Sequence, residues 1–137
     1  MLYHKAYELL KNSDSPKLMP DLCANLGDAY VFDNDLPKAA LWYRKALFIA
    51  DSLQLPKVQN ASLYMGLGRI YLLLEDFEAS LNCYQQTEKS FSDLSLNLQA
   101  YFLNNYGNYY YYTKDYQTSL KKFLMLKKLL EKPVSYT

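Results

Sequence analysis

The sequence is poor in the residues on which turn-rich, disulfide-rich and many catalytic proteins depend. Its 137 residues include 4 glycines, 5 prolines, 2 cysteines and 1 histidine. So few glycines and prolines argue against a β-rich chain with many tight turns. Cys23 and Cys83 lie far apart and form no Cys-x-x-Cys pair, so we expect two buried thiols rather than a disulfide or a redox pair.

Charge of one sign is also lacking. The chain has 15 basic and 14 acidic side chains, and Arg44 and Arg69 are its two arginines. This balance does not provide the basic surface of a dedicated nucleic-acid binder. No apolar run reaches the roughly 18 residues of a membrane-spanning helix, and no signal peptide is visible at the start. We therefore expect a cytoplasmic protein with neither a nucleic-acid nor a membrane partner.

An internal repeat organises the residues that are present. Three segments align on Gly27, Gly68 and Gly107, with spacings of 41 and 39 residues. A tyrosine follows each glycine after three residues, an aspartate after eight, a small residue after twelve and an aromatic residue after sixteen. The residues in these positions are Tyr30, Tyr71 and Tyr110; Asp35, Asp76 and Asp115; Ala39, Ser80 and Ser119; and Tyr43, Tyr84 and Phe123. Such agreement in three copies indicates a repeat of about 40 residues.

With Leu26-Gly27, Tyr30, Ala39 and Tyr43 in the first copy, the chain resembles the tetratricopeptide repeat (TPR) family. The period exceeds the family's roughly 34 residues, as in the long-helix variants of bacterial peptide-responsive regulators and some eukaryotic adaptors. The resemblance implies an all-α fold, namely a right-handed superhelical array of antiparallel helix pairs.

Apolar spacing and capping signals predict where the helices lie. We expect each aspartate of the repeat to cap the second helix of a pair, and Pro37 to occupy a first turn, where its missing N–H does no harm. The close approach of paired helices explains the small residues in mid-helix. The predicted helices are 2–12, 17–32, 36–54, 57–74, 77–92, 96–112 and 116–131.

Alignment also predicts the domain organisation. Tyr3-His4-Lys5-Ala6 matches Tyr43-Arg44-Lys45-Ala46, so the chain is expected to start within a repeat and to be part of a larger protein. The final helix has an apolar stripe too broad for one neighbour, which either more chain or a second subunit would cover. The predicted segments are 1–15, the second helix of a truncated repeat; 16–55, 56–94 and 95–132, repeats one to three; and 133–137, a tail.

Residues that could carry out catalysis or bind a metal ion are scarce. A catalytic triad would need His4, which aligns with Arg44 in a position that we interpret as solvent-facing. Metal sites need clustered Cys, His or carboxylate side chains, and phosphate loops need characteristic glycine spacings, neither of which occurs. We therefore expect no enzyme, no metal site and no cofactor.

The TPR resemblance implies that the first helices of the repeats line a concave groove that binds ligands. Asn104 and Asn108 share a helix face about 6 Å apart, close to the roughly 6.7 Å two-residue repeat of an extended peptide. Alternatively, they are only polar groups facing a wet groove. Carried over by alignment, the candidate ligand-binding residues are Asn104, Asn108, Tyr101, Tyr111, Tyr112, Arg69, Met65, Leu72 and Asp28.

The sequence favours a non-catalytic module that binds a protein or peptide segment. It would be the sensory or adaptor region of a larger, bacterial signalling or regulatory protein. The alternative is an oligomerisation or spacer element that forms a homodimer through its apolar terminal helix. Binding of single-stranded nucleic acid by tyrosine stacking is disfavoured by the near-zero charge.

Overall fold

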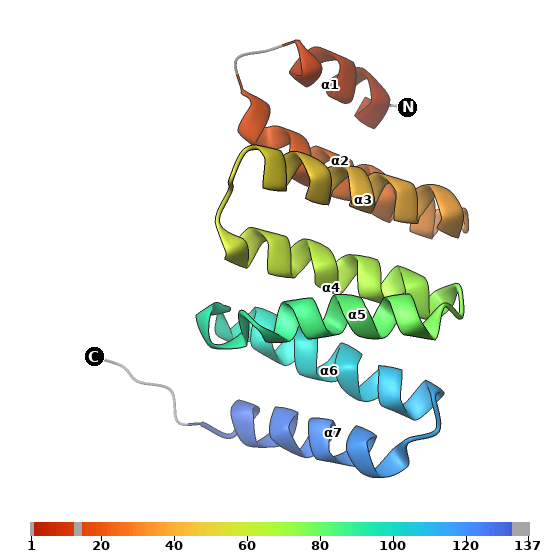
Figure 1. Cartoon of the computed structure of the whole chain (residues 1–137), viewed down its shortest axis with the longest axis vertical. Coiled ribbons are helices and arrows are strands. Elements are labelled where there is room, and N and C mark those ends of the chain that lie inside the picture. Colours follow the sequence, from red (N-terminus) through yellow and green to blue (C-terminus); the bar gives the residue numbers. More distant parts are fainter. Residues whose placement is uncertain (1, 13–14, 133–137) are drawn as a thin grey trace. The chain divides into compact units, whose positions relative to one another are not determined.

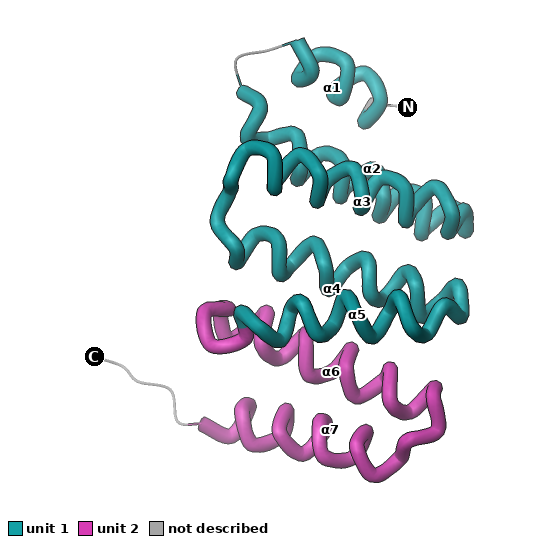
Figure 2. Tube along the Cα trace, in the orientation of Figure 1, with its two compact units in different colours: residues 1–90 teal, residues 91–137 magenta. Residues whose placement is uncertain are grey.

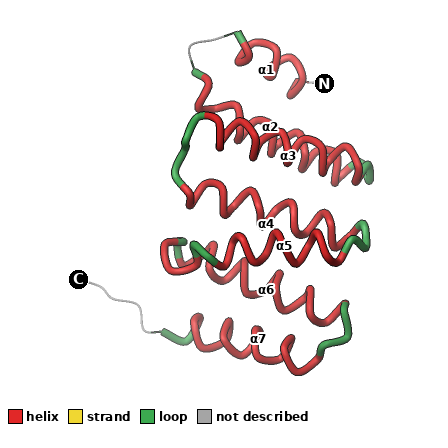
Figure 3. Tube along the Cα trace, viewed as in Figure 1, coloured by secondary structure: helices red, strands yellow, loops and turns green. Residues whose placement is uncertain are grey.

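The computed structural model describes residues 2–12 and 15–132, and within this part of the chain every regular element is a helix (Figures 1 and 3). The all-α expectation is confirmed. The expected tail at 133–137 and residues 13–14 lie outside the described residues. The helices are α1 (Leu2–Lys11), α2 (Met19–Phe32), α3 (Leu36–Ser52), α4 (Lys57–Leu73), α5 (Phe77–Glu88), α6 (Leu96–Tyr112) and α7 (Tyr116–Leu130), with single 3-10 turns η1 (Pro16–Leu18) and η2 (Phe91–Asp93).

The predicted helix bounds agree with these to within two residues at every end except the end of α5, and the largest of the smaller differences are at the start of α2 and the end of α3. The helix predicted from residue 17 begins at Met19, because Pro16–Leu18 form a separate 3-10 turn that precedes Pro20 in the first turn of α2. The helix predicted to reach residue 92 ends at Glu88. There the Ser90 N–H donates to the carbonyl of Thr87, three residues earlier, at 3.0 Å. This 3-10 hydrogen bond closes the last turn of the helix.

The chain divides into two compact units, residues 1–90 and 91–137 (Figure 2). In unit 1, α1 packs on α2, α2 on α3, α3 on α4 and α4 on α5. In unit 2, α6 packs on α7. These pairs are consecutive in the sequence, so packing within each unit is built from neighbouring helices.

Each helix pair turns in the same way. Asn34, Glu75 and Lys114 have φ values of 59°, 61° and 67°, the left-handed conformation that ends a helix. The following aspartate then caps the next helix. Asp35, Asp76 and Asp115 accept hydrogen bonds from the backbone N–H three residues later, at 3.3, 3.2 and 3.1 Å. The predicted N-caps are confirmed, as is Pro37 in the first turn of α3.

The repeated glycines let aromatic rings pack against a helix backbone. A Cβ added at Gly27 would lie 2.5 Å from the Tyr43 ring, one at Gly68 3.1 Å from the Tyr84 ring, and one at Gly107 2.7 Å from the Phe123 ring. The small residue of the second helix adds a hydrogen bond where it is serine. The donors are the hydroxyls of Ser80 and Ser119, each 2.8 Å from the carbonyl oxygen of the paired glycine, Gly68 or Gly107.

Tyr43 links three helices of unit 1. Its ring, on α3, lies between Gly27 of α2 and Gly66 of α4. Its hydroxyl donates to Asp28 Oδ1 at 2.6 Å. Burial and this hydrogen bond raise the pKa of the Tyr43 phenol, so it stays protonated and donating.

The two cysteines are free and buried, as expected. Burial raises the pKa of the Cys23 thiol to about 11 and that of the Cys83 thiol to about 12. Both are therefore neutral thiols that fill the core at ordinary pH.

The expectation that His4 faces solvent is wrong. His4 is half-buried, its Nε2 lies 3.0 Å from the Tyr30 hydroxyl, and its ring packs edge-on against Tyr30 and Trp42. The aligned Arg44 makes the equivalent contact, since its Nη1 donates to the Tyr71 hydroxyl at 2.9 Å. Both residues therefore join their own helix to the next one along the chain, although Arg44 is exposed.

Candidate functional site

Five of the predicted ligand-binding residues lie on one side of α6. At about 100° per residue, Tyr101, Asn104, Asn108, Tyr111 and Tyr112 share a single stripe, which we name the α6 face. The tyrosines are 61%, 56% and 64% exposed, although large aromatic side chains are mostly buried in proteins. Asn104 is exposed and Asn108 half-buried. The α6 face therefore presents three large rings and two amides to solvent.

Unit 2 holds this face in place from behind. The opposite side of α6 buries Phe102, Leu103 and Tyr106. The Ser95 hydroxyl caps the helix by accepting from the Leu98 N–H at 3.3 Å. The Gln99 side chain donates to the Phe91 carbonyl at 3.0 Å, tying η2 to the first turn of α6. The exposed residues are thus carried by a capped helix whose position is set by packing.

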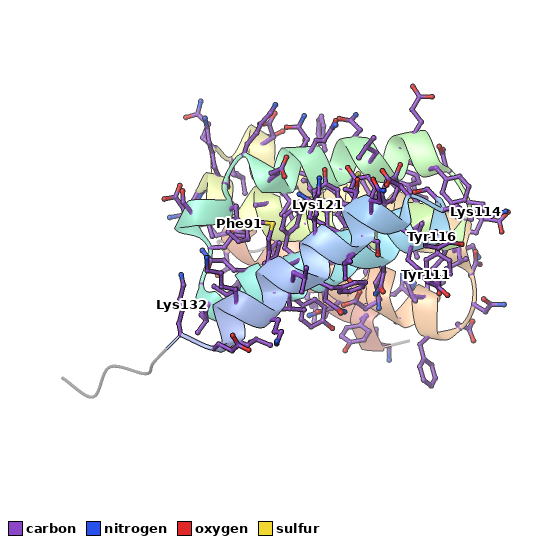
Figure 4. All side chains as sticks on the ribbon, turned by 90° about the horizontal axis from the view of Figure 1, so that it is seen from below. Phe91, Tyr111, Lys114, Tyr116, Lys121 and Lys132 are labelled. Atoms are coloured by element: carbon purple, nitrogen blue, oxygen red, sulfur yellow. The ribbon has the colours of Figure 1, made fainter. Side chains whose placement is uncertain are left out.

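The rings at the end of α6 support one another. The Tyr111 ring meets Tyr112 at 5.9 Å between centroids and Tyr116 of α7 at 5.6 Å, both edge to face. In Figure 4, Tyr111, Lys114 and Tyr116 gather at one end of the α6–α7 pair, and Phe91 and Lys132 lie at the other. Mutual packing restricts these side chains, so less entropy is lost when a ligand covers them.

A shallow hollow of about 520 Å³ adjoins the α6 face. From α6 it is lined by Asn97, Ala100, Tyr101 and Asn104, and from α7 by Leu126 and Leu130. The arrangement offers apolar carbons together with neutral donors and acceptors. None of the residues that line it is an Asp, Glu, Lys, Arg or His, so it suits a neutral or apolar group.

The other four predicted residues belong to unit 1. Asp28 is exposed but its carboxylate accepts the Tyr43 hydroxyl, so part of its capacity is already used. Arg69 is exposed and Leu72 half-buried. Met65 is 6% exposed and contributes to packing rather than to an open surface. Met65 was predicted to be available to a ligand, and it is not. The position of a residue on a helix face does not reveal what covers it.

The sequence did not predict the hollow or the packing of Tyr116 against Tyr111. The available signal was the repeat alignment, in which Leu126 and Leu130 stand where the first repeat has Ala46 and Ala50. A large apolar residue in place of a buried alanine indicates a changed surface. Tyr116 was interpreted only as the start of a helix.

Residues 2–12 and 15–132 lack two other kinds of feature, a metal-ligand cluster and a membrane-spanning helix. That part of the chain contains no group of three or more His, Cys, Asp or Glu side chains that could hold a metal ion. It also contains no helix with both the length and the apolar character needed to cross a bilayer.

The chain resembles a solved structure more clearly than any sequence family. No family model and no curated protein matches the sequence. The crystal structure of BtubC (BKLC) from P. vanneervenii is similar, with a TM-score of 0.80 and 24% identity over 93% of this chain. The matched region is 54% of that protein, so this chain spans about half its length. At this identity the similarity shows the fold alone.

Proposed function

We propose that the protein is a non-catalytic module that binds a protein or peptide segment. Its helix pairs would stack as a right-handed, TPR-like superhelical array. Three pairs with the same left-handed turn, aspartate cap and glycine–aromatic contact support this architecture. The module would act without cofactor or metal, in the cytoplasm, as the sensory or adaptor region of a larger bacterial signalling or regulatory protein.

The α6 face is the observation that carries this proposal. The amide of an Asn side chain can donate to a peptide carbonyl and accept from a peptide N–H, and Asn104 and Asn108 repeat at about the spacing of an extended chain. The exposed tyrosines add contact area with a polar tip, as is common at protein interfaces. An extended segment lying along α6 would use both. In unit 1, exposed Arg69 would attract an acidic group.

A peptide-display selection on the purified chain tests the proposal. We expect enriched peptides whose binding is lost in Asn104→Ala/Asn108→Ala and retained in Asn82→Ala, an exposed asparagine on α5. All variants must melt at the same temperature as the wild type. Peptides that bind the double variant as tightly as the wild type would show that the asparagines do not form the site.

The exposed leucines of α7 favour a second candidate, a homodimer formed through that helix. Leu120, Leu124 and Leu130 are each more than half exposed. Sedimentation velocity over a range of concentrations distinguishes the two functions. A dimer that Leu124→Asp dissociates would favour the oligomerisation element, and a monomer at all concentrations would favour the binding module.

A further inference from the structure

A second hollow, of about 540 Å³, opens on the exposed side of α5 in unit 1, and we name it the α5 hollow. Two carboxylates, two side-chain amides and two apolar residues line it, namely Asp76, Glu78, Asn82, Gln85, Ala79 and Leu81. The four polar residues are all exposed. No lysine, arginine or histidine belongs to the lining. The α5 hollow therefore presents negative charge and amide oxygen atoms to solvent without a balancing cation.

The first and third helix pairs show how a capping aspartate is satisfied. In both, Oδ1 accepts the backbone N–H of the residue three positions later. The side chain of that later residue occupies the other oxygen. Lys38 Nζ lies 3.7 Å from Asp35 Oδ2, and the Thr118 hydroxyl donates to Asp115 Oδ2 at 2.8 Å. Each of these two aspartates thus uses both oxygens within its own helix.

The second pair lacks the second contact. Its residue at the same position is Ala79, whose methyl group neither donates a hydrogen bond nor carries charge. Asp76 Oδ1 accepts the Ala79 N–H at 3.2 Å, but among residues 2–12 and 15–132 no hydrogen bond or ion pair reaches Asp76 Oδ2. Within the same part of the chain, the carboxylate of Glu78 also has no ion pair. Two carboxylates with unused oxygen atoms therefore line one hollow.

The other two copies of the repeat carry cations where the α5 hollow has none. Subtracting 41 (68 minus 27, the aligned glycines) maps Ala79 and Gln85 onto Lys38 and Arg44 of α3. Adding 39 (107 minus 68) maps Asn82 onto Lys121 of α7. The surfaces of α3 and α7 thus supply positive charge of their own. On α5, the complementary cation has to come from another molecule.

The guanidinium group of an arginine matches this lining. It has five N–H donors in one plane and no acceptor, so it can donate to both carboxylates and to an amide oxygen together. The ammonium group of a lysine is a compact point charge with three donors, and it matches two separate carboxylates less well. The methylene stem of an arginine can lie along Ala79 and Leu81.

The turn beside the hollow indicates that the arginine belongs to a protein segment rather than to a small free amine. Leu74 and Phe77, on either side of this turn, are 37% and 39% exposed. Apolar residues exposed next to a charged hollow provide contact area for the residues that flank the arginine. Glu75, also in the turn, is exposed and adds negative charge.

We propose that the α5 hollow binds an arginine side chain of a partner protein, whose guanidinium donates to Asp76 Oδ2 and to the carboxylate of Glu78. At Asp76 the guanidinium takes the position that Lys38 and Thr118 have in the other pairs. This goes beyond the proposed function, because the hollow belongs to α5 of unit 1 and the α6 face to unit 2.

Two matched peptides test the proposal on the full chain. One is acetyl-Leu-Arg-Leu-amide, and the other has citrulline, a neutral residue of nearly the same shape, in place of arginine. Heteronuclear NMR spectra of the isotope-labelled chain detect weak binding and locate it. At low salt we expect the arginine peptide to shift the side-chain amide signals of Asn82 and Gln85. It should bind at least about fivefold more tightly than the citrulline peptide, with a difference that shrinks as salt is added.

Two variants take their new residue from another copy of the repeat, so each is compatible with the fold. Ala79→Lys gives Asp76 the cation that Lys38 gives Asp35, and should weaken binding of the arginine peptide at least about fivefold. Glu78→Gln introduces the residue of the third copy and should weaken binding at least about twofold. Glu8→Gln, at an exposed glutamate of α1, is the control and should bind as the wild type does.

Melting curves by circular dichroism check that every variant is folded. Asn104→Ala/Asn108→Ala should also bind the arginine peptide as the wild type does, so failure here and failure of the proposed function are distinguishable. Equal binding of the two peptides, no shifts with either, shifts confined to residues outside α5 and its preceding turn, or binding unchanged in Ala79→Lys would each overturn the proposal.

Discussion

Replacing Gly27 by alanine tests how the helix pairs are held together. The new methyl would lie 2.5 and 2.7 Å from two carbons of the Tyr43 ring and 3.2 Å from the Ala39 carbonyl oxygen. Tyr43 has little room to yield. Its other side meets Gly66 of α4, and its hydroxyl is bonded to Asp28. The alanine must therefore displace a ring that is fixed from three directions.

The magnitude follows from opposing contributions. Overpacking of this kind costs about 1–3 kcal/mol. A weakened Tyr43–Asp28 hydrogen bond adds about 1 kcal/mol. Alanine returns about 1 kcal/mol through its better helix propensity. We expect Gly27→Ala to lower the free energy of unfolding by about 1–3 kcal/mol.

Gly107→Ala is the matched control. Its Cβ would lie 2.7 Å from the Phe123 ring, a similar overlap. Phe123, however, is half-buried and carries no hydroxyl, so it can turn away. We expect a change within about 0.5 kcal/mol, because the gain in propensity offsets the adjustment.

Urea unfolding measures both variants. Fluorescence of Trp42, the single tryptophan, reports on α3 in unit 1, and circular dichroism reports on all helices. Gly27→Ala as stable as the wild type, or Gly107→Ala more destabilised than Gly27→Ala, would refute the account of Tyr43 as a ring fixed between two glycines.

Two further predictions concern the turns between paired helices. Lys114→Gly should raise the melting temperature, with a gain of about 0.5–1 kcal/mol, because glycine adopts the φ of 67° without the clash of a Cβ. Asn34→Gly should gain less, since asparagine tolerates this conformation, and equal gains at both sites would contradict the reasoning. Hydrogen bonds from the Thr118 hydroxyl (2.8 Å) and N–H (3.1 Å) lower the pKa of Asp115. A lowered folded-state pKa stabilises the protein above the usual Asp range of about 3.9, and this contribution is lost as pH falls through the folded value. Asp115→Asn should therefore melt below the wild type near neutral pH, with a gap that closes in acid, and a gap that is constant with pH would count against a role for the charge.

The sequence predicted the local structure well because local signals suffice for it. The aspartate caps and the close-packed glycines act within one helix pair, and each repeats in three copies. The bounds of α5 were less accurate, since the Ser90–Thr87 hydrogen bond that ends it has no signal in the apolar pattern.

The candidate site was predicted in part. The exposed stripe of Tyr101, Asn104 and Tyr112 followed from helix periodicity, and the structure places it on one side of α6. The environments of His4 and Met65 did not follow. His4 contacts Tyr30 and Trp42 of two other helices and Met65 is buried, and periodicity within one helix does not reveal its neighbours.

By itself the sequence determined which residues form helices, where those helices are capped and which positions must be small. These depend on hydrogen bonds and contacts between residues near one another in the chain. Only the tertiary structure decided which apolar residues are covered. Ala50 and Leu130 occupy the same position in two copies of one repeat, yet one is buried and the other exposed. Burial depends on whether another helix packs on that face. The position of a residue in its own helix does not reveal whether a second helix covers it.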